Sequence, residues 1–167
     1  MSKTDLLNSK VYSGAKFSPC RKYRYSLWRE WDETKSTCVF IGLNPSTANE
    51  SEDDPTIRRC IQFAKDWGCG RLVMVNLFAY RATDPDVMKS SKSPVGKNND
   101  INLLTECSKA ELIIAAWGNH GLFEGRGDAV KTLLKEVELK CLKITVKGQP
   151  AHPLYQAADA KLLDFNF

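Results

Sequence analysis

Four apolar runs in this chain each end in side chains that can donate and accept hydrogen bonds. These terminal side chains are carboxamides and imidazoles: Asn44, Asn76, the neighbouring Asn119 and His120, and His152. An amide presents a donor beside an acceptor, so it can pair with the edge of a heterocyclic base. An imidazole can hold or release a proton near neutral pH. Such groups suit a metal-free site that positions water and stabilises negative charge as a bond to an anionic leaving group breaks.

The first of these strand ends carries the clearest signal. Five strand-forming residues, Thr37 to Ile41, run into Gly42-Leu43-Asn44-Pro45, and the proline prevents the strand from continuing. In α/β proteins, ligands bind at the carboxyl ends of parallel strands. A single Asn at a strand end is more often a turn former than a functional group. Held there by a rigid proline, however, Asn44 is placed to orient a water molecule or a polar group of a substrate.

The elements that would position these side chains alternate along the sequence. After the first strand, strands are expected at 71–77, 112–117 and 139–146, and helices at 54–67, 98–108 and 126–136. This alternation predicts right-handed crossovers and a parallel sheet, so the four strand ends would share one edge. We therefore predict an α/β fold of three layers, α/β/α, with a central, mainly parallel, four-stranded sheet. Asn44, Asn76, Asn119 and His152 should line one cleft at its carboxyl edge.

Two of the expected helices carry more specific signals. Asp54 followed by Pro55 predicts an N-cap and the first helical position. Within 98–108, the spacing of Ile101, Leu104 and Cys107 predicts the buried face of the helix.

Length and composition indicate one globular domain that spans 1–167. The chain is 43% hydrophobic and 26% charged, with a net charge of +4. No apolar run approaches the ~20 residues that cross a bilayer. The N-terminus lacks the hydrophobic region of a signal peptide, so we expect no membrane association and a cytoplasmic location. The six cysteines include no Cys-x-x-Cys pair, so we expect reduced thiols, no metal and no cofactor.

Positive charge gathers near the N-terminus. Between Lys16 and Arg29 there are five basic residues, interleaved with aromatic ones, and no acidic residue. This mixture suits contact with phosphates and bases, with Arg21, Lys22 and Arg24 as candidates for binding DNA. The alternative is an edge strand from Arg21 to Leu27, with aromatic side chains packed inward and charges in water. On either interpretation, 1–36 is an N-terminal extension or edge strand of the domain.

The four strand ends, in this order, resemble the motifs of the uracil-DNA glycosylase superfamily. Gly42-Leu43-Asn44-Pro45 resembles its Gly-x-Asp/Asn-Pro loop, in the Asn form of the mismatch-specific branch. Asn76 ends a strand similar to the one whose terminal Asn contacts the flipped base. Residues 116–120 are similar to the Trp-Gly-x-His segment, and 149–153 to the final His-Pro loop. Over its whole length, the chain resembles more closely an uncharacterised bacterial and phage family placed near these glycosylases.

This resemblance implies a DNA glycosylase-like hydrolase that flips out and excises a uracil-type or 5-substituted pyrimidine from DNA. Asn44 would hold the attacking water, Asn76 would read the base, and His152 would donate to the base carbonyl that gains charge. The residues implied to surround the base or nucleotide are Gly42, Leu43, Pro45, Ser46, Asn76, Asn119 and His120, and Tyr155 is a further candidate for contact with DNA. Ser46 stands where the uracil-specific branch has a bulky tyrosine, which implies room for a 5-substituent.

Two departures from the family pattern keep a second hypothesis open. Asn44 carries an amide, which cannot act as a base. His152-Pro153 is followed by Leu154-Tyr155 and not by the Ser-Pro of the family motif. The alternative is a non-catalytic module that binds a nucleotide or nucleic acid on the same fold. A weaker third hypothesis is transfer chemistry on nucleotides in the same pocket.

Overall fold

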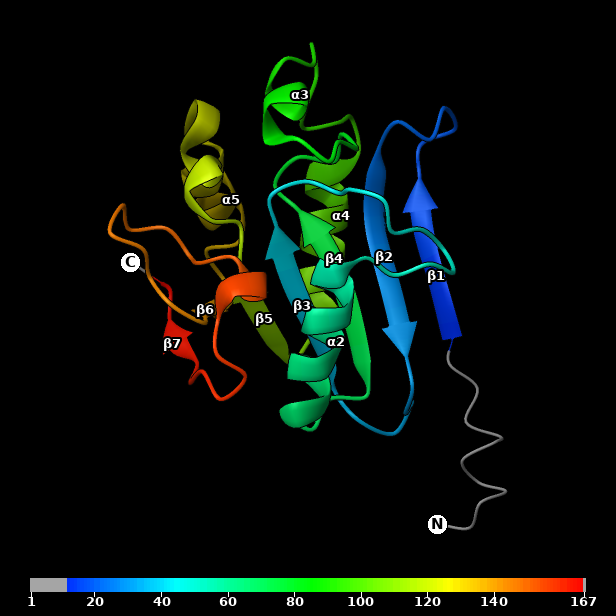
Figure 1. Ribbon diagram of the computed structural model, residues 1–167, viewed down its shortest axis with the longest axis vertical. Coiled ribbons are helices and arrows are strands. Elements are labelled where there is room, and N and C mark those ends of the chain that lie inside the picture. Colours follow the sequence, from blue (N-terminus) through cyan, green and yellow to red (C-terminus); the bar gives the residue numbers. More distant parts are fainter. Residues whose placement is uncertain (1–11, 167) are drawn as a thin grey trace.

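The computed structural model describes residues 12–166, and its centre is a seven-stranded mixed sheet with the order β1-β2-β4-β3-β5-β6-β7 (Figure 1). The strands are β1 Tyr12–Phe17, β2 Arg24–Glu30, β3 Thr37–Gly42, β4 Arg71–Asn76, β5 Leu112–Ala115, β6 Lys140–Cys141 and β7 Leu163–Asp164. β4, β3, β5 and β6 are parallel to one another. β2 is antiparallel to both β1 and β4, and β7 is antiparallel to β6.

The predicted α/β class is confirmed, but the predicted four-stranded sheet is wrong. The hairpin of β1 and β2 adds two antiparallel strands beside β4, and β7 adds one at the other side. β2 is therefore an interior strand and not the edge strand predicted from Arg21 to Leu27. That interpretation of Arg21 to Leu27 placed the basic side chains of the segment in water, whereas Arg24 is buried.

The last expected strand is also shorter than the sequence pattern suggests. Of residues 139–146, β6 takes up only Lys140 and Cys141. The chain then forms a tight turn in which the Gly148 N–H donates to the Thr145 carbonyl and Thr145 N–H donates to the Gln149 carbonyl. The alternation of apolar and polar residues after Cys141 thus belongs to this turn, which carries the chain back toward His152.

Helices cover both faces of the sheet, which gives the three layers. They are α2 Pro55–Asp66, α3 Pro85–Lys89, α4 Asn99–Lys109 and α5 Arg126–Leu133, with 3₁₀ helices η1 Asn119–Gly125 and η2 Pro153–Tyr155. Figure 1 shows α2 in front of the sheet and α4 behind it. Side chains of β3 alternate between the two layers: Cys38 and Phe40 pack in the core that includes α2, and Val39 and Ile41 in the core that includes α4 and α5.

The buried face of α4 differs from the predicted one. Ile101 and Leu104 are 64% and 42% exposed, whereas Asn99 and Leu103 are buried along with Cys107. Asn99 is stable inside because its Nδ2 donates to the carbonyls of Asn76 and Leu77, each at 2.9 Å. Hydrophobic spacing cannot reveal a buried face that includes a hydrogen-bonded amide.

The cysteines carry free thiols, and all but Cys20 are buried. Within residues 12–166, no helix is long and apolar enough to cross a membrane. The same part of the chain contains no group of three or more His, Cys, Asp or Glu side chains arranged to hold a metal ion.

Candidate functional site

A cleft of about 760 Å³ lies where the carboxyl ends of β3 and β4 meet the start of α2, the segment after β5 and η2. Asn44, Asn76, Asn119 and His152 all line it, as predicted from the four strand ends. Every residue expected to surround a base or nucleotide lines it too, and so does Tyr155. The sequence prediction of one shared cleft is therefore confirmed. The chemical roles assigned to these residues stay predictions.

The segments that follow β3 and β4 are joined by backbone hydrogen bonds. Leu77 N–H donates to the Gly42 carbonyl, and Phe78 N–H to the Leu43 carbonyl, each at 2.9 Å. Gly42 also leaves space for the side chain of Asn76, because a Cβ atom at this position would lie 2.8 Å from Asn76 Oδ1. The first motif thus supports the residue at the end of the neighbouring strand.

The Nδ2 group of Asn44 forms hydrogen bonds that join two segments of the cleft wall. Its Nδ2 donates to the Ala82 carbonyl at 2.8 Å and more weakly to the Pro45 carbonyl at 3.2 Å. The Ala82 N–H in turn donates to the Pro45 carbonyl at 2.9 Å. Nδ2 is therefore committed to structure, and the acceptor Oδ1 is the part of Asn44 that can hold a water molecule.

Asn76 lies at the bottom of the cleft with an unused donor. Its side chain is 1% exposed, and Nδ2 has no hydrogen-bond partner within the described part of the chain. The backbone next to it is fixed by Asn99 and by Arg126, whose Nε donates to the Leu77 carbonyl at 2.9 Å. A buried donor without a partner costs on the order of 1–3 kcal/mol, and a ligand with an acceptor would remove that cost.

The geometry of His152 fixes which ring nitrogen can donate. His152 is the N-cap of η2, and its Nδ1 accepts a hydrogen bond from Leu154 N–H at 3.2 Å. The neutral ring must then carry its proton on Nε2. Burial lowers the pKa of His152, and the nearby Asp54 carboxylate acts in the opposite direction. At neutral pH the ring is therefore uncharged and presents Nε2–H as a donor.

Asn119 and His120 lie at the rim of the cleft and are exposed. Gly118 precedes them with φ of 69° and ψ of −170°, a conformation that favours glycine, and its N–H donates to the Pro150 carbonyl at 2.7 Å. The Asn119 Oδ1 accepts from the Thr145 hydroxyl at 2.7 Å, and His120 Nδ1 lies 3.0 Å from Lys89 Nζ. Both rim side chains thus have partners in the protein.

Sequence reasoning missed Asp54 as a site residue. Its Oδ1 accepts from Ile57 N–H at 2.8 Å, which confirms the predicted N-cap of α2. Asp54 also lines the cleft, where it is the one carboxylate among the described lining residues. In the sequence, the position of Asp54 directly before Pro55 is fully explained by its role as an N-cap. No further sequence signal therefore indicated that Asp54 also lines the cleft.

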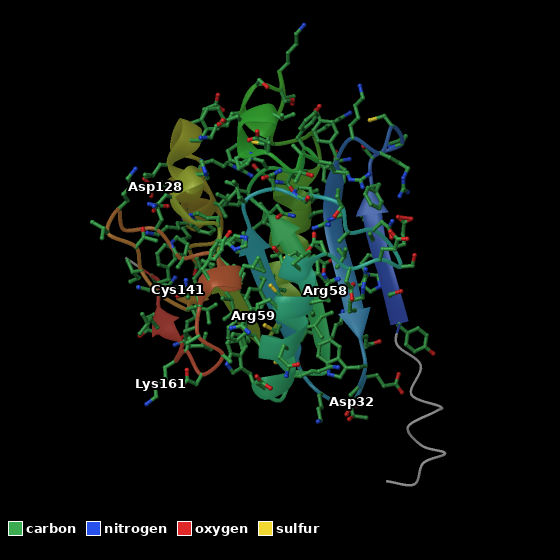
Figure 2. All side chains as sticks on the ribbon, in the orientation of Figure 1. Asp32, Arg58, Arg59, Asp128, Cys141 and Lys161 are labelled. Carbon is green, nitrogen blue, oxygen red and sulfur yellow. The ribbon has the colours of Figure 1, made fainter. Side chains whose placement is uncertain are left out.

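The helix that Asp54 caps is fastened to the turn that carries His152. Figure 2 shows Arg58 and Arg59 on opposite sides of α2, with Arg59 on the side of η2. Arg59 Nη2 donates to the Gln156 carbonyl, directly after η2. This contact holds Asp54 and His152 on two elements that are linked to each other.

The three basic residues predicted to bind DNA have different environments. Arg21 is exposed but paired, with Nη2 at 2.6 Å from Glu50 Oε1 and its guanidinium 4.0 Å from the centre of the Phe17 ring. Lys22 is exposed. Arg24 is 2% exposed and lines the cleft, so it does not lie on an exposed basic surface with Arg21 and Lys22, and its contact with DNA stays a prediction. It is buried because β2 is an interior strand.

Comparison with known proteins identifies a family. The family model described as "Protein of unknown function (DUF1643)" matches residues 24–154, which include β2 and the whole cleft up to Leu154. No curated protein and no solved structure matches the chain.

Proposed function

Because this chain belongs to the DUF1643 family, which is described as being of unknown function, we propose its activity from the cleft itself. The protein is a DNA glycosylase-like hydrolase that flips a uracil-type or 5-substituted pyrimidine out of DNA and cleaves its bond to the sugar. The observation that carries the proposal is the convergence of Asn44, Asn76, His152 and Asp54 on one cleft. Its volume of about 760 Å³ lies within the roughly 300–1,000 Å³ of small-ligand sites.

Recognition of the base is assigned to Asn76. Its buried Nδ2 has no partner in the described chain, and a pyrimidine carbonyl is an acceptor that would fill this vacancy. Discrimination is strong where a site's buried polar groups are left unpaired by the wrong ligand. Ser46 lines the cleft wall with only a small side chain, whose hydroxyl lies 3.2 Å from that of Thr83. The small size of this side chain supports access for a 5-substituent on the base.

Stabilisation of the leaving group is assigned to His152. The base departs with the bonding electron pair, so negative charge grows on its ring and carbonyl oxygens. A neutral imidazole that presents Nε2–H donates to such an oxygen without giving up a proton. The hydrogen bond from Leu154 N–H to Nδ1 supports this role, because it holds the ring in the required tautomer.

Activation of water is assigned to Asn44 and Asp54 together. Asn44 Oδ1 holds the water, and the carboxylate of Asp54 accepts its proton. The water oxygen bonds to C1′ of the sugar while the C1′–N1 bond breaks, which gives an abasic sugar, a pyrimidine anion and protonated Asp54. The anion then takes up a proton from solvent and Asp54 releases its proton to solvent, so the net products are a free pyrimidine and an abasic sugar. Asp54 supplies the base that the Asn form of the first motif lacks.

The order of the motifs also supports a fold of the uracil-DNA glycosylase type. We place its four parallel strands at β4, β3, β5 and β6, with the antiparallel strands as additions. A structure determined with an abasic-site or pyrimidine ligand in the cleft would test that assignment.

The direct test of the activity is base release. The purified protein is incubated with single- and double-stranded oligonucleotides that contain uracil, thymine or a series of 5-substituted pyrimidines, and alkali-labile abasic sites are counted. We expect abasic sites with at least one of these bases and none with purines. A protein that binds the oligonucleotides but releases no base from any of them is not a glycosylase.

One observation favours the second candidate, a binding module without chemistry. Asn44 Nδ2 is committed to the Ala82 carbonyl, so this residue has a structural role that would keep it in the sequence without catalysis. In that case Asn76 and His152 would bind a nucleotide, and the same incubation would show binding with intact glycosidic bonds.

A further inference from the structure

Arg24 carries a buried positive charge at the border of the cleft. Its side chain is 2% exposed, and it forms no ion pair with any carboxylate of residues 12–166. Nη1 donates to the Ala48 carbonyl at 3.1 Å, whereas Nε has no hydrogen-bond partner. A buried charge without a counter-charge is costly for a protein to keep, so its presence in a ligand cleft needs a reason.

The second buried arginine of β2 shows that an arginine inside this strand can be fully hydrogen-bonded. Arg29 is 3% exposed, and each of its nitrogens has an acceptor. Nε donates to Asp53 Oδ1 at 2.8 Å, Nη1 to the Trp28 carbonyl at 2.8 Å and Nη2 to the Asn49 carbonyl at 2.6 Å. Arg29 does not line the cleft with Arg24. The two side chains differ in hydrogen bonding, and the incompletely satisfied one borders the cleft.

The balance of charge around Arg24 favours the binding of an anion. The groups that act on it are Asp54, which favours the charged form, and Arg81 and Arg29, which oppose it. Burial lowers the pKa of Arg24 to about 10, so the guanidinium stays protonated at neutral pH. Asp54 is placed by its N-cap bond to Ile57 N–H and makes no ion pair with Arg24. Arg29 is already paired with Asp53, so Arg24 and Arg81 stand against the single carboxylate of Asp54, and this excess of positive charge attracts an anionic ligand.

We infer that Arg24 forms a subsite for an oxyanion of the ligand, in the same cleft in which Asn76 Nδ2 is left to bind the base. A guanidinium presents its donors in a planar fork that matches phosphate and carboxylate oxygens. The shared chemistry therefore has two sources: a phosphate of the nucleotide, or an acidic substituent on the base. This inference rests on the proposed function only in taking the ligand to be a pyrimidine nucleotide, and it specifies that the ligand carries its anionic group inside the cleft.

The test compares neutral and anionic ligands by isothermal titration calorimetry with the full-length protein. The ligands are thymidine, its 5′- and 3′-monophosphates, 5-carboxyuracil, uracil and inorganic phosphate. We expect the wild type to bind one class of anionic ligand about 10- to 100-fold more tightly than its neutral counterpart, the range expected for a charge-assisted hydrogen bond. A preference for a monophosphate over thymidine identifies a phosphate site, and a preference for 5-carboxyuracil over uracil identifies a site for an acidic base. No preference in the wild type overturns the inference.

Two substitutions locate the effect. Arg24→Met is expected to abolish the anion preference and to leave the affinity for the neutral ligand within about threefold, while Arg24→Lys keeps part of the preference because the charge remains. Arg58→Met, on an exposed arginine of α2 that does not line the cleft, is the control and should change neither. A preference that survives in Arg24→Met overturns the inference.

Stability without ligand gives an independent readout. Arg24→Met removes an uncompensated buried charge in a volume that methionine can largely fill, so its melting temperature should equal or exceed that of the wild type. A marked decrease would instead mean that Arg24 is structural like Arg29, and would overturn the inference.

The anion subsite and the proposed hydrolase activity can be refuted independently of each other. Base release without anion preference refutes only the subsite, and anion preference without base release refutes only the hydrolase.

Discussion

At the scale of single residues, the cleft is best understood by asking which polar atoms are already occupied. Asn44 Nδ2 and His152 Nδ1 are bound to backbone groups, and so is one oxygen of Asp54. What these three residues can offer a ligand is therefore an amide oxygen, an imidazole N–H and the second carboxylate oxygen. One group holds water, one takes a proton and one donates to a developing charge, which matches the needs of glycosidic bond hydrolysis.

The proposed proton-accepting role of Asp54 can be tested separately from its capping role. Asparagine is as good an N-cap as aspartate, so Asp54→Asn should change the free energy of unfolding by less than about 1 kcal/mol. The same change removes the base, and single-turnover base release should fall roughly 10²- to 10⁴-fold. Asp84→Asn is the matched control, because Asp84 caps α3, is followed by Pro85 and does not itself line the cleft. Equal rates for Asp54→Asn and the wild type would exclude Asp54 as the base.

His152 should make the stability of the protein depend on pH in the weakly acidic range. Burial places its folded-state pKa below the ordinary value of 6.5, so the unfolded chain takes up the proton first as the pH falls. The contribution to stability is complete above about pH 6.5 and is lost as the pH falls through the folded-state pKa. In melting experiments between pH 8 and pH 5, His152→Gln should show a smaller loss of melting temperature than the wild type. His120→Gln, at the exposed rim, should follow the wild type, and a matching curve for His152→Gln would contradict the prediction.

At the scale of elements, the sequence predicted the parts that place the site better than the parts that surround it. β3 and β4 carry continuous apolar runs, and the Asp54-Pro55 start of α2 has a local signal, so all three were found nearly to the residue. The four strand ends then followed from the rule for parallel crossovers. Local patterns were enough here because the determinants are themselves local.

The elements that were misjudged depend on partners far away in the chain. β2 looked like an exposed basic strand because nothing near Arg29 in sequence shows that carbonyls of residues 49, 50 and 52 will surround it. The buried face of α4 was missed because the Asn99 Nδ2 finds its acceptors at the end of β4, far away in the sequence. Arg24 was grouped with the exposed residues Arg21 and Lys22 because nothing near it in sequence shows that it is buried beside the cleft. Buried polar side chains cannot be told from exposed ones until their partners are placed.

The packing of β3 against the end of β4 gives a prediction for Gly42. Gly42→Ala would place a Cβ atom 2.8 Å from Asn76 Oδ1 and 2.9 Å from Met74 Cε, so these side chains must move. We expect a loss of roughly 1–3 kcal/mol in the free energy of unfolding and weaker discrimination between pyrimidines. A double-mutant cycle with Asn76→Ala checks the cause. If Asn76 is the group displaced, the two changes couple, and additive values would point to another neighbour.

At the scale of the whole molecule, the β1–β2 hairpin changes where DNA would contact the protein under the proposed function. The basic stretch expected to form one surface is divided between the interior and the exterior. Arg24 and Arg29 point their charges into the fold, Arg21 is neutralised by Glu50, and Lys22 is exposed. The electrostatic contribution to DNA binding from this segment should therefore be smaller than the sequence suggests.

The salt dependence of DNA binding measures that contribution. Lys22→Gln should reduce the slope of log K against log salt concentration by about one, the value for a single phosphate contact. Arg21→Gln should reduce it by less, because Glu50 already neutralises the guanidinium. Lys161→Gln is the control, since Figure 2 shows Lys161 on the opposite side of the molecule from the hairpin. An unchanged slope for Lys22→Gln would remove this hairpin from the DNA-binding surface.

The hydrogen bond from Asn44 to the Ala82 carbonyl also limits how this lineage can evolve. A one-nucleotide change from an asparagine to an aspartate codon is the shortest route to a carboxylate base in the first motif, which would speed the proposed reaction. Here it would set a carboxylate oxygen about 2.8 Å from a carbonyl oxygen and remove the cross-link between two segments. Lineages that keep this cross-link are therefore held to the amide at position 44, and any gain in activity has to come from substitutions elsewhere in the cleft.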